Sequence, residues 1–117
     1  MAIDCLIVDD NQDFLAAART LLEREGLTIA GVASTGADAL RKVGMLRPDV
    51  VLVDISLGDE SGIDLARRLV ATPATVILIS TRSEAELADL IAMSPAAGFL
   101  SKPELSAAAI RGFLDGS

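Results

Sequence analysis

Short apolar runs alternate with longer segments of helical period along the chain, and this alternation constrains the fold more than any other feature. Runs rich in Val and Ile predict strands, and most of them are almost continuously apolar, which is typical of parallel strands covered on both faces. The strands are expected at residues 3–8, 27–33, 50–54, 75–80 and 97–100. Apolar residues at helical spacing predict helices at residues 12–25, 36–46, 61–71, 83–93 and 104–115. This order of elements predicts an α/β fold with helices on both faces of a parallel sheet.

The chain also carries signals for element ends and for a single domain. Gly26 follows the first predicted helix, where glycine commonly ends a helix, and Ser83 with Glu86 three residues later indicates a capping box before the fourth helix. All four prolines fall between predicted elements. With 117 residues, of which 51% are hydrophobic, the chain has the size and apolar content of one domain, residues 1–117.

Polar residues stand at the ends of the apolar runs, where neighbouring parallel strands bring side chains together. Asp9 and Asp10 follow the first run, Asp54 ends the third, Ser80 ends the fourth and Lys102 follows the fifth. Right-handed crossovers bring the carboxyl ends of all strands to one edge, the usual binding edge of open α/β sheets. Converging carboxylates repel one another and suit Mg²⁺, which binds one or two carboxylates together with phosphate oxygens. A site for phosphoryl chemistry is therefore the leading hypothesis.

The charge balance and the absence of histidine argue against several other functions. The net charge is −7 and the ten Lys and Arg form no run, so direct binding of nucleic acid is disfavoured. Without histidine, serine triads, cysteine–histidine nucleophiles and most zinc sites are excluded. No run approaches the roughly 20 apolar residues of a membrane span, and the first residues lack the basic region of a signal peptide, so we expect a cytoplasmic protein without a membrane partner. The single cysteine, Cys5, is expected to be a buried apolar residue.

Several of these features occur together in a known order. They are the segment Ile7-Val8-Asp9-Asp10-Asn11, the segment from Asp54 to Gly62, Ser80, Phe99 and the pair Lys102-Pro103. Together they resemble the receiver domain of bacterial two-component response regulators, over nearly the whole chain. The resemblance implies a flavodoxin-like fold, in which a five-stranded parallel sheet of order 2-1-3-4-5 is doubly wound by five helices. It also implies a peptide bond before Pro103 that is often cis.

The resemblance assigns a role to each member of the acidic cluster. Asp54 corresponds to the phosphoacceptor. Mg²⁺, or Mn²⁺ in its place, would be bound by Asp10 directly, by Asp9 through water, by Asp54 and by the backbone carbonyl of Ser56. Lys102 corresponds to the lysine that stabilises the transferred phosphoryl group. Such a domain is not an enzyme, apart from its own phosphorylation and dephosphorylation.

The resemblance also implies switch and tuning residues. Ser80 corresponds to the hydroxyl that approaches the phosphoryl group, and Phe99 to the aromatic residue that turns when this hydroxyl moves. Thr81 stands where the family mostly has alanine or glycine, and its bulk beside the phosphoryl path is expected to slow phosphotransfer. Ser56 and Arg82 flank the acceptor, and we hypothesise that Arg82 leans over the phosphoryl group and slows its hydrolysis.

Two functions remain open on this basis. The first is a phosphorylation-dependent signalling switch whose donor is a sensor histidine kinase or a phosphotransfer protein. Its output face, formed by helix 83–93, strand 97–100 and helix 104–115, would engage a downstream protein or an appended effector domain. The alternative is a pseudo-receiver that uses this face without phosphorylation, which Thr81 favours. A phosphatase of the aspartate-nucleophile type would need a second acid two residues after the acceptor, where Ser56 stands. The chain is expected to be a stand-alone receiver or the receiver of a longer DNA-binding regulator, and to be able to form a homodimer on activation.

Overall fold

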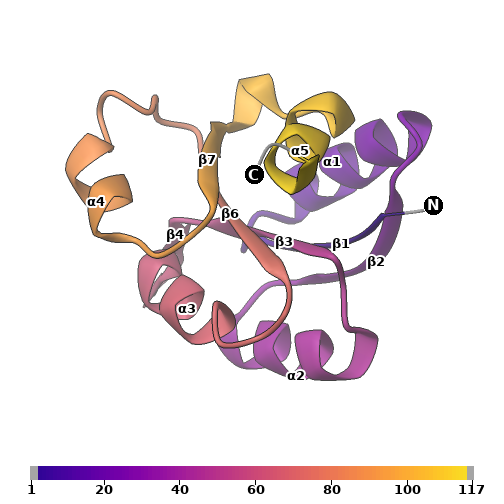
Figure 1. Cartoon of the computed structure of the whole chain (residues 1–117), viewed down its shortest axis with the longest axis horizontal. Helices are drawn as coiled ribbons and strands as arrows, with labels where there is room; N and C mark the ends of the chain where they lie inside the picture. The colour runs from indigo at the N-terminus through magenta and orange to yellow at the C-terminus, as the bar shows by residue number, and fades with distance from the viewer. Residues whose placement is uncertain (1–2, 116–117) are drawn as a thin grey trace.

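Strands and helices alternate along the chain, as the apolar runs predict (Figure 1). The structure is a computed structural model that describes residues 3–115; residues 1–2 and 116–117 of the predicted domain lie outside the described part. The long strands are β1 (Asp4–Val8), β2 (Thr28–Ala33), β3 (Val50–Asp54), β6 (Thr75–Ser80) and β7 (Gly98–Ser101). The helices are α1 (Gln12–Arg24), α2 (Gly36–Leu46), α3 (Gly62–Leu69), α4 (Ala88–Met93) and α5 (Ala107–Asp115).

The long strands form one parallel sheet in the order β2-β1-β3-β6-β7. This is the predicted order 2-1-3-4-5 when only the long strands are numbered. β1 pairs with β2 on one side and with β3 on the other, so that Val8 lies opposite both Ala33 and Val53. The direction of winding reverses between β1 and β3, and open α/β sheets bind ligands beyond the strand ends at this point. The residues that follow Val8 and Val53 therefore meet at the expected binding edge.

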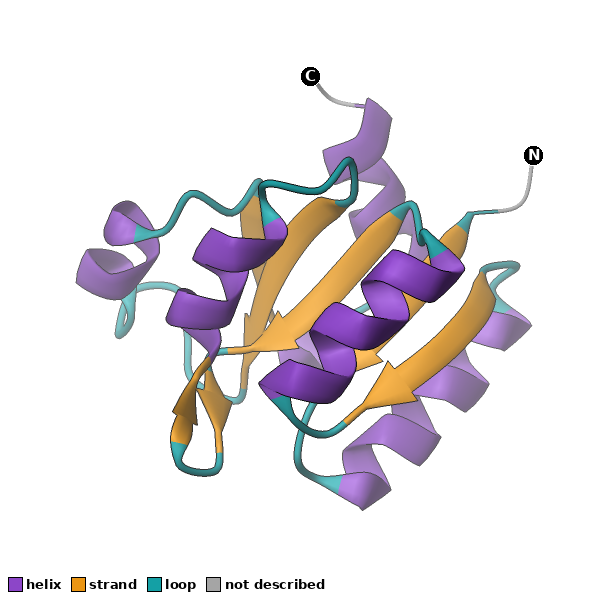
Figure 2. Cartoon of the chain, turned by 90° about the horizontal axis from the view of Figure 1, so that it is seen from below, coloured by secondary structure: helices purple, strands orange, loops and turns teal. Residues whose placement is uncertain are grey.

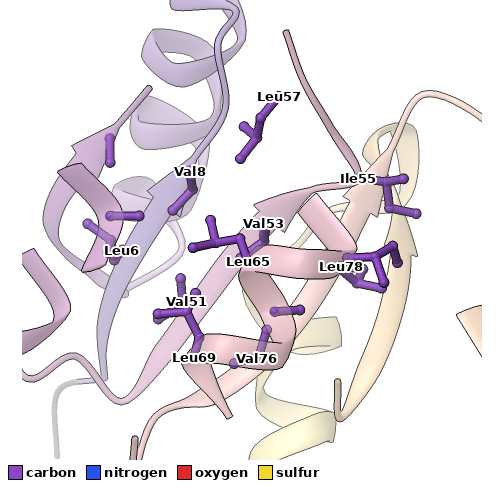
Figure 3. Packing of buried hydrophobic residues seen from close by; sticks show 14 of the residues in the cluster. Leu6, Val8, Val51, Val53, Ile55, Leu57, Leu65, Leu69, Val76 and Leu78 are labelled. Atoms are coloured by element: carbon purple, nitrogen blue, oxygen red, sulfur yellow. The ribbon is translucent and has the colours of Figure 1, made fainter. Parts of the chain in front are cut away.

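The sheet separates two hydrophobic clusters, because successive side chains of a strand point to opposite faces. Leu6 and Val8 of β1 belong to the α2–α3 cluster, which includes buried residues of those two helices. Cys5 and Ile7 belong to the α1–α5 cluster on the other face. Figure 1 shows the two pairs of helices on opposite sides of the sheet. Figure 3 shows members of the α2–α3 cluster, among them Leu6, Val8, Val51, Val53, Leu65, Leu69, Val76 and Leu78.

The first three helices start at side-chain caps, which stabilise the free N–H groups of a first helical turn. The capping residues are Asn11 for α1, Thr35 for α2 and Ser61 for α3, and each accepts a hydrogen bond from the backbone N–H three residues later. α1 ends as predicted before Gly26, which has a φ of +97°. The caps fix the helix starts at the same edge of the sheet as the strand ends.

The fourth helix is shorter than predicted. The capping box forms, since Glu86 N donates to Ser83 Oγ at 3.2 Å and Ser83 N donates to Glu86 Oε1 at 3.4 Å. Residues 84–87 nevertheless form turns, and α4 begins only at Ala88. None of the residues of α4 is buried, although Ile91 packs partly buried against the α2–α3 cluster, and a short helix with so little packing gains little from capping alone. The prediction of a helix over 83–93 is therefore wrong in its first half.

The other helix boundaries also differ from the prediction. α3 ends at Leu69, two residues early, and α5 begins at Ala107 after a 3₁₀ turn over Lys102–Glu104. The peptide bond before Pro103 is trans, as are all peptide bonds of the described residues. Within residues 3–115, no helix has both the length and the apolar content needed to cross a lipid bilayer.

A small hairpin follows β3, and the sequence did not predict it. β4 (Ser56–Leu57) and β5 (Glu60–Ser61) pair antiparallel, and Figure 2 shows them beyond the end of the main sheet, beside α3. Strands of two residues are too short to carry a hydrophobic period. Gly58 lies in the turn with a φ of +58°, a backbone conformation that costs glycine little. We call residues 56–61 the β4–β5 hairpin.

The single cysteine is buried within the sheet, and its burial was predicted. Cys5 lies on β1, is fully buried and forms no disulfide. Burial raises the pKa of its thiol to about 12. The thiol is therefore protonated at neutral pH and packs as a small apolar side chain.

Candidate functional site

The polar residues predicted from the strand ends all lie at the carboxyl edge of the sheet. Asp9 and Asp10 follow β1 directly, Asp54 is the last residue of β3 and Ser80 is the last residue of β6. Lys102 follows β7. Because β1 and β3 are neighbours in the sheet, Asp9 and Asp54 occupy adjacent positions at this edge.

Three carboxylates converge here, and we call Asp9, Asp10 and Asp54 the carboxylate triad. Each offers an oxygen atom that lies within 4.8 Å of the oxygen atoms of the other two. Asp9 is fully buried and Asp54 is 8% exposed, whereas Asp10 is exposed to solvent. Backbone N–H groups hold the two buried carboxylates: Asn11 N donates to Asp9 Oδ1 at 2.9 Å, and Ser56 N donates to Asp54 Oδ1 at 3.0 Å.

The ammonium group of Lys102 lies between the two buried carboxylates. Its Nζ is 2.6 Å from Asp9 Oδ2 and 3.2 Å from Asp54 Oδ2. Asp9 Oδ2 has no other partner among the described residues, so this ion pair alone balances it. The same Nζ lies 4.1 Å from the centre of the Phe14 ring, in a cation–π contact. The sequence predicted that Lys102 lies at the site, but not that its shortest contact is with Asp9.

The electrostatics of the site favour an additional positive charge. Burial and the neighbouring charge of Asp9 raise the pKa of Asp54, against the opposing effects of the Ser56 N–H and Lys102. Burial would lower the pKa of Lys102, but its contacts with Asp9 and Asp54 outweigh this effect and raise the pKa. Two carboxylate charges at about 5 Å repel by about 3 kcal/mol at an effective dielectric constant near 20. One ammonium group cannot balance three ionised carboxylates.

The residues of the triad fit a hard divalent cation. Their donor atoms are all oxygens, and Mg²⁺ prefers oxygen ligands. The exposed carboxylate of Asp10 gives an ion a route from solvent. Sulfur and imidazole ligands, which would favour zinc, do not contribute to this cluster. The arrangement is therefore suited to a Mg²⁺ ion beside a nucleophilic carboxylate.

Removing the charge of Lys102 is expected to destabilise the metal-free protein. In Lys102→Met the side chain keeps its bulk, but Asp9 remains buried without a counter-charge. Loss of one partner of a buried ion pair should lower the free energy of unfolding by about 3 kcal/mol. Urea denaturation in the presence of a metal chelator measures this change.

A matched control for this prediction is Arg19→Met. Arg19 forms a half-exposed ion pair with Glu23 at 3.5 Å, and such surface pairs contribute less than about 1 kcal/mol. Saturating Mg²⁺ should also recover part of the stability lost in Lys102→Met, because the metal charge replaces the ammonium charge. Equal losses in the two variants would contradict the proposed charge balance.

A comparison with protein families places this geometry in context. Residues 5–111 match the family model of the response regulator receiver domain. The chain belongs to this family. The match covers β1 through most of α5, so the fold, the carboxylate triad and Lys102 all lie within the receiver domain.

Curated relatives of this receiver domain include longer proteins. Response regulator UvrY of Escherichia coli K12 is 33% identical over 120 residues, an alignment that covers 97% of this chain and 55% of UvrY. Protein-glutamate methylesterase/protein-glutamine glutaminase 5 of Myxococcus xanthus is 36% identical over 105 residues, covering 86% of this chain and 30% of that protein. The chain thus spans little more than half of the length of UvrY and less than a third of the length of the methylesterase.

Solved receiver domains have the same fold. The signal receiver domain of a modulated diguanylate cyclase from Desulfovibrio desulfuricans G20 aligns with a TM-score of 0.81 and 31% identity, covering 99% of this chain and 93% of that one. The response regulator domain of Thermotoga maritima CheB aligns with a TM-score of 0.76 and 24% identity, covering 98% and 90% of the two chains. The predicted flavodoxin-like fold is therefore confirmed.

The two predicted switch residues lie in different places: Ser80 lies at the carboxyl edge of the sheet, and Phe99 lies in the hydrophobic interior. Ser80 is 8% exposed, and its Oγ accepts a hydrogen bond from Arg82 N at 3.1 Å. A hydroxyl can accept one hydrogen bond and donate another at the same time. The Oγ–H of Ser80 therefore remains able to donate a hydrogen bond to a different group. Phe99 is buried in the α2–α3 cluster rather than at the carboxylate triad. Thr81 and Arg82 are exposed beside the site.

Three residues near the site were missed by reasoning from the sequence. Phe14 lies within the first predicted helix, and its ring contacts Lys102. Glu60 carries no signal of a partner in the sequence, but it accepts hydrogen bonds from the N-terminus of α2. The N–H of Gly62 donates to Ile55 O at 2.8 Å, and its Cα lies against the backbone of Asp54. A glycine eight residues after the acceptor was the only signal available for any of them.

Proposed function

We propose that this receiver domain is a phosphorylation-dependent switch of a two-component system, in which Asp54 accepts a phosphoryl group in a Mg²⁺-dependent reaction. The observation that supports the proposal best is the position of Lys102, whose ammonium contacts Asp54 and Asp9 where the carboxylate triad converges. A nucleophilic carboxylate, an acidic metal-binding cluster and a positioned cation are the components that phosphoryl transfer to an aspartate requires.

The proposed donor is the phosphohistidine of a sensor histidine kinase or of a phosphotransfer protein. None of the 117 residues is a histidine, so the phosphohistidine would lie outside this domain. In the transfer, an oxygen of Asp54 forms a bond to phosphorus while the bond between phosphorus and the donor imidazole breaks. The imidazole nitrogen leaves with the electron pair and takes up a proton, and Asp54 becomes an acyl phosphate.

The residues of the site would assist this transfer in different ways. The Ser56 N–H holds Asp54 Oδ1 and so orients the carboxylate. Lys102, close to Asp54 Oδ2, would stabilise the charge on the phosphoryl oxygens. A bound Mg²⁺, or Mn²⁺, would supply further positive charge beside these oxygens. Its proposed ligands are Asp10, Asp54 and the backbone carbonyl of Ser56, with Asp9 binding it through water.

Phosphorylation would be transmitted by the residues at the ends of β6 and β7. A phosphorylated Asp54 carries new acceptor oxygens, and the Oγ–H of Ser80 is a suitable donor for them. Movement of Ser80 would open space for a rotation of Phe99, which supports a change on the face formed by α4, β7 and α5. α4 has no buried residue, so its displacement would disrupt little packing. This face is the proposed contact for a downstream protein, an attached effector domain or a second receiver.

The residues around the acceptor are proposed to tune the lifetime of the phosphorylated state. Ser56, Thr81 and Arg82 are all exposed beside Asp54 or Ser80. Thr81 adds bulk at the entrance, and the side chain of Arg82 has the reach and charge to approach a phosphoryl group from solvent. Both effects would slow phosphoryl transfer from the donor to Asp54 and hydrolysis of the phosphorylated Asp54.

Titration with Mg²⁺ and beryllofluoride, a mimic of the phosphoryl group, tests the proposal. Mg²⁺ at 100 times its dissociation constant should raise the free energy of unfolding by about 2.7 kcal/mol, and a chelator should reverse the change. Beryllofluoride should raise the melting temperature further, but only when Mg²⁺ is present. NaCl at equal ionic strength controls for screening. If neither addition changes the melting temperature, the phosphorylation-independent pseudo-receiver becomes the better description.

A further inference from the structure

We propose that Glu60 is a positioning residue that fastens the β4–β5 hairpin to the N-terminus of α2 and thereby holds one side of the metal site in place. The inference rests on the proposed function, since it concerns the same metal site. Glu60 lies on β5 and touches neither the carboxylate triad nor Lys102 through any hydrogen bond or ion pair of the described residues. Its effect on the metal would therefore be transmitted through the hairpin.

The contact between Glu60 and α2 is specific. Both carboxylate oxygens accept from the N–H of Gly36, the first residue of α2, at 3.1 and 3.2 Å. Free N–H groups and the helix dipole make this end of a helix favourable for a carboxylate. Thr35 caps a different group, the N–H of Asp38. Glu60 thus adds a second cap from a distant part of the chain.

The absence of a side chain at position 36 makes this contact possible. A Cβ added to Gly36 would lie 2.6 Å from Glu60 Oε1, which is closer than real Cβ contacts allow. Because this oxygen ends a flexible side chain, an added methyl group would displace the carboxylate of Glu60 from its observed position. Gly36 and Glu60 therefore act as a matched pair.

The hairpin that Glu60 fastens binds one of the three carboxylates and lies near a second. At its start, Ser56 donates its N–H to Asp54 Oδ1 and is the residue whose carbonyl is proposed to bind the metal. At its turn, a Cβ added to Gly58 would be in ordinary van der Waals contact with Asp10 Oδ2, at 3.4 Å. A displacement of the hairpin would therefore alter the distances among the metal ligands.

The hairpin needs such a support, because two-residue strands are marginally stable by themselves. Leu57 anchors the first strand in the α2–α3 cluster, where it is 2% exposed. On the second strand, Glu60 itself is exposed and is held by its bonds to Gly36. Without these bonds, metal binding would have to order the hairpin as well, which would weaken the affinity.

Three single variants test the proposal through the dissociation constant of Mg²⁺, measured by calorimetry on the full chain. Glu60→Ala should weaken Mg²⁺ binding about tenfold, the lower end of the effect of outer-shell partners on metal sites. Glu60→Gln should recover most of the affinity, because its amide oxygen can still accept from Gly36. Asp59→Ala removes the same charge from the same hairpin and should change the affinity less than about twofold. At saturating Mg²⁺ all three should be phosphorylated at rates near that of the wild type.

A double-mutant cycle with Gly36→Ala separates positioning from general destabilisation. Gly36→Ala should weaken Mg²⁺ binding when Glu60 is present and should have no further effect in Glu60→Ala. Equal affinities of Glu60→Ala and Asp59→Ala, or additive losses in the cycle, would overturn the role of Glu60 and leave the proposed function standing. Failure of the wild type to bind Mg²⁺ would overturn both.

Discussion

Replacing Asp54 with asparagine should abolish labelling of the receiver domain by acetyl phosphate in the presence of Mg²⁺. The amide carries no negative charge and is a poor nucleophile, whereas its size leaves the surrounding packing unchanged. Its oxygen can still accept from Ser56 N, so the β4–β5 hairpin should keep its position. Phosphorylation is followed by mass spectrometry of the intact protein. Asp89→Asn, an exposed acid on α4, is the matched control and should be labelled like the wild type.

A second readout of Asp54→Asn is its stability without metal. The pKa of Asp54 is raised in the folded protein, mainly by burial and by Asp9, so folding disfavours the ionised carboxylate. This cost is fully present above the folded pKa and disappears as the pH falls below the unfolded pKa. The variant should therefore be more stable than the wild type at neutral pH, and the gain should shrink in acid. Persistent labelling of Asp54→Asn would disprove the assignment of the acceptor.

Adding a single methyl group at Gly62 should cause the largest loss of stability of any substitution considered. A Cβ at this position would lie 1.9 Å from the carbonyl oxygen of Asp54 and 2.8 Å from Ile55 Cα. Both atoms belong to the backbone at the end of a central strand and cannot move aside like a side chain. We expect Gly62→Ala to lower the free energy of unfolding by more than about 4 kcal/mol, as measured by urea denaturation.

The matched control for this substitution is Gly44→Ala. Gly44 lies within α2 and has no heavy atom within 4 Å of an added Cβ. Alanine is favoured over glycine in a helix, so this variant should gain about 0.5–1 kcal/mol. The two substitutions have the same chemistry and opposite expected signs. A similar change in both variants would show that the contact between Gly62 and Asp54 does not constrain the fold.

The sheet and the members of the site could be predicted because their signals are local. Buried parallel strands produce continuous apolar runs, and the residues that follow such runs must lie at the carboxyl edge of the sheet. Asp9, Asp10, Asp54, Ser80 and Lys102 were placed correctly by this reasoning alone. The order of the strands came from the resemblance to receivers, since alternation of strands and helices does not determine it.

The features that escaped prediction depend on contacts between distant segments. The bond between Glu60 and Gly36 joins residues 24 positions apart, and Lys102 and Phe14, which are in contact, lie even further apart in the sequence. No periodicity or spacing encodes such pairs. The late start of α4 has the same origin, because a correct capping signal at Ser83 was not matched by burial of the helix that follows.

The division of the interior by the sheet has a consequence for how such a domain can change shape. Phe99 lies in the α2–α3 cluster, whereas Cys5, Ile7 and the buried faces of α1 and α5 lie in the other. A rearrangement that turns Phe99 would loosen contacts on one side only. The opposite half of the molecule would keep its contacts during such a rearrangement, so the proposed switch would not require the domain to unfold.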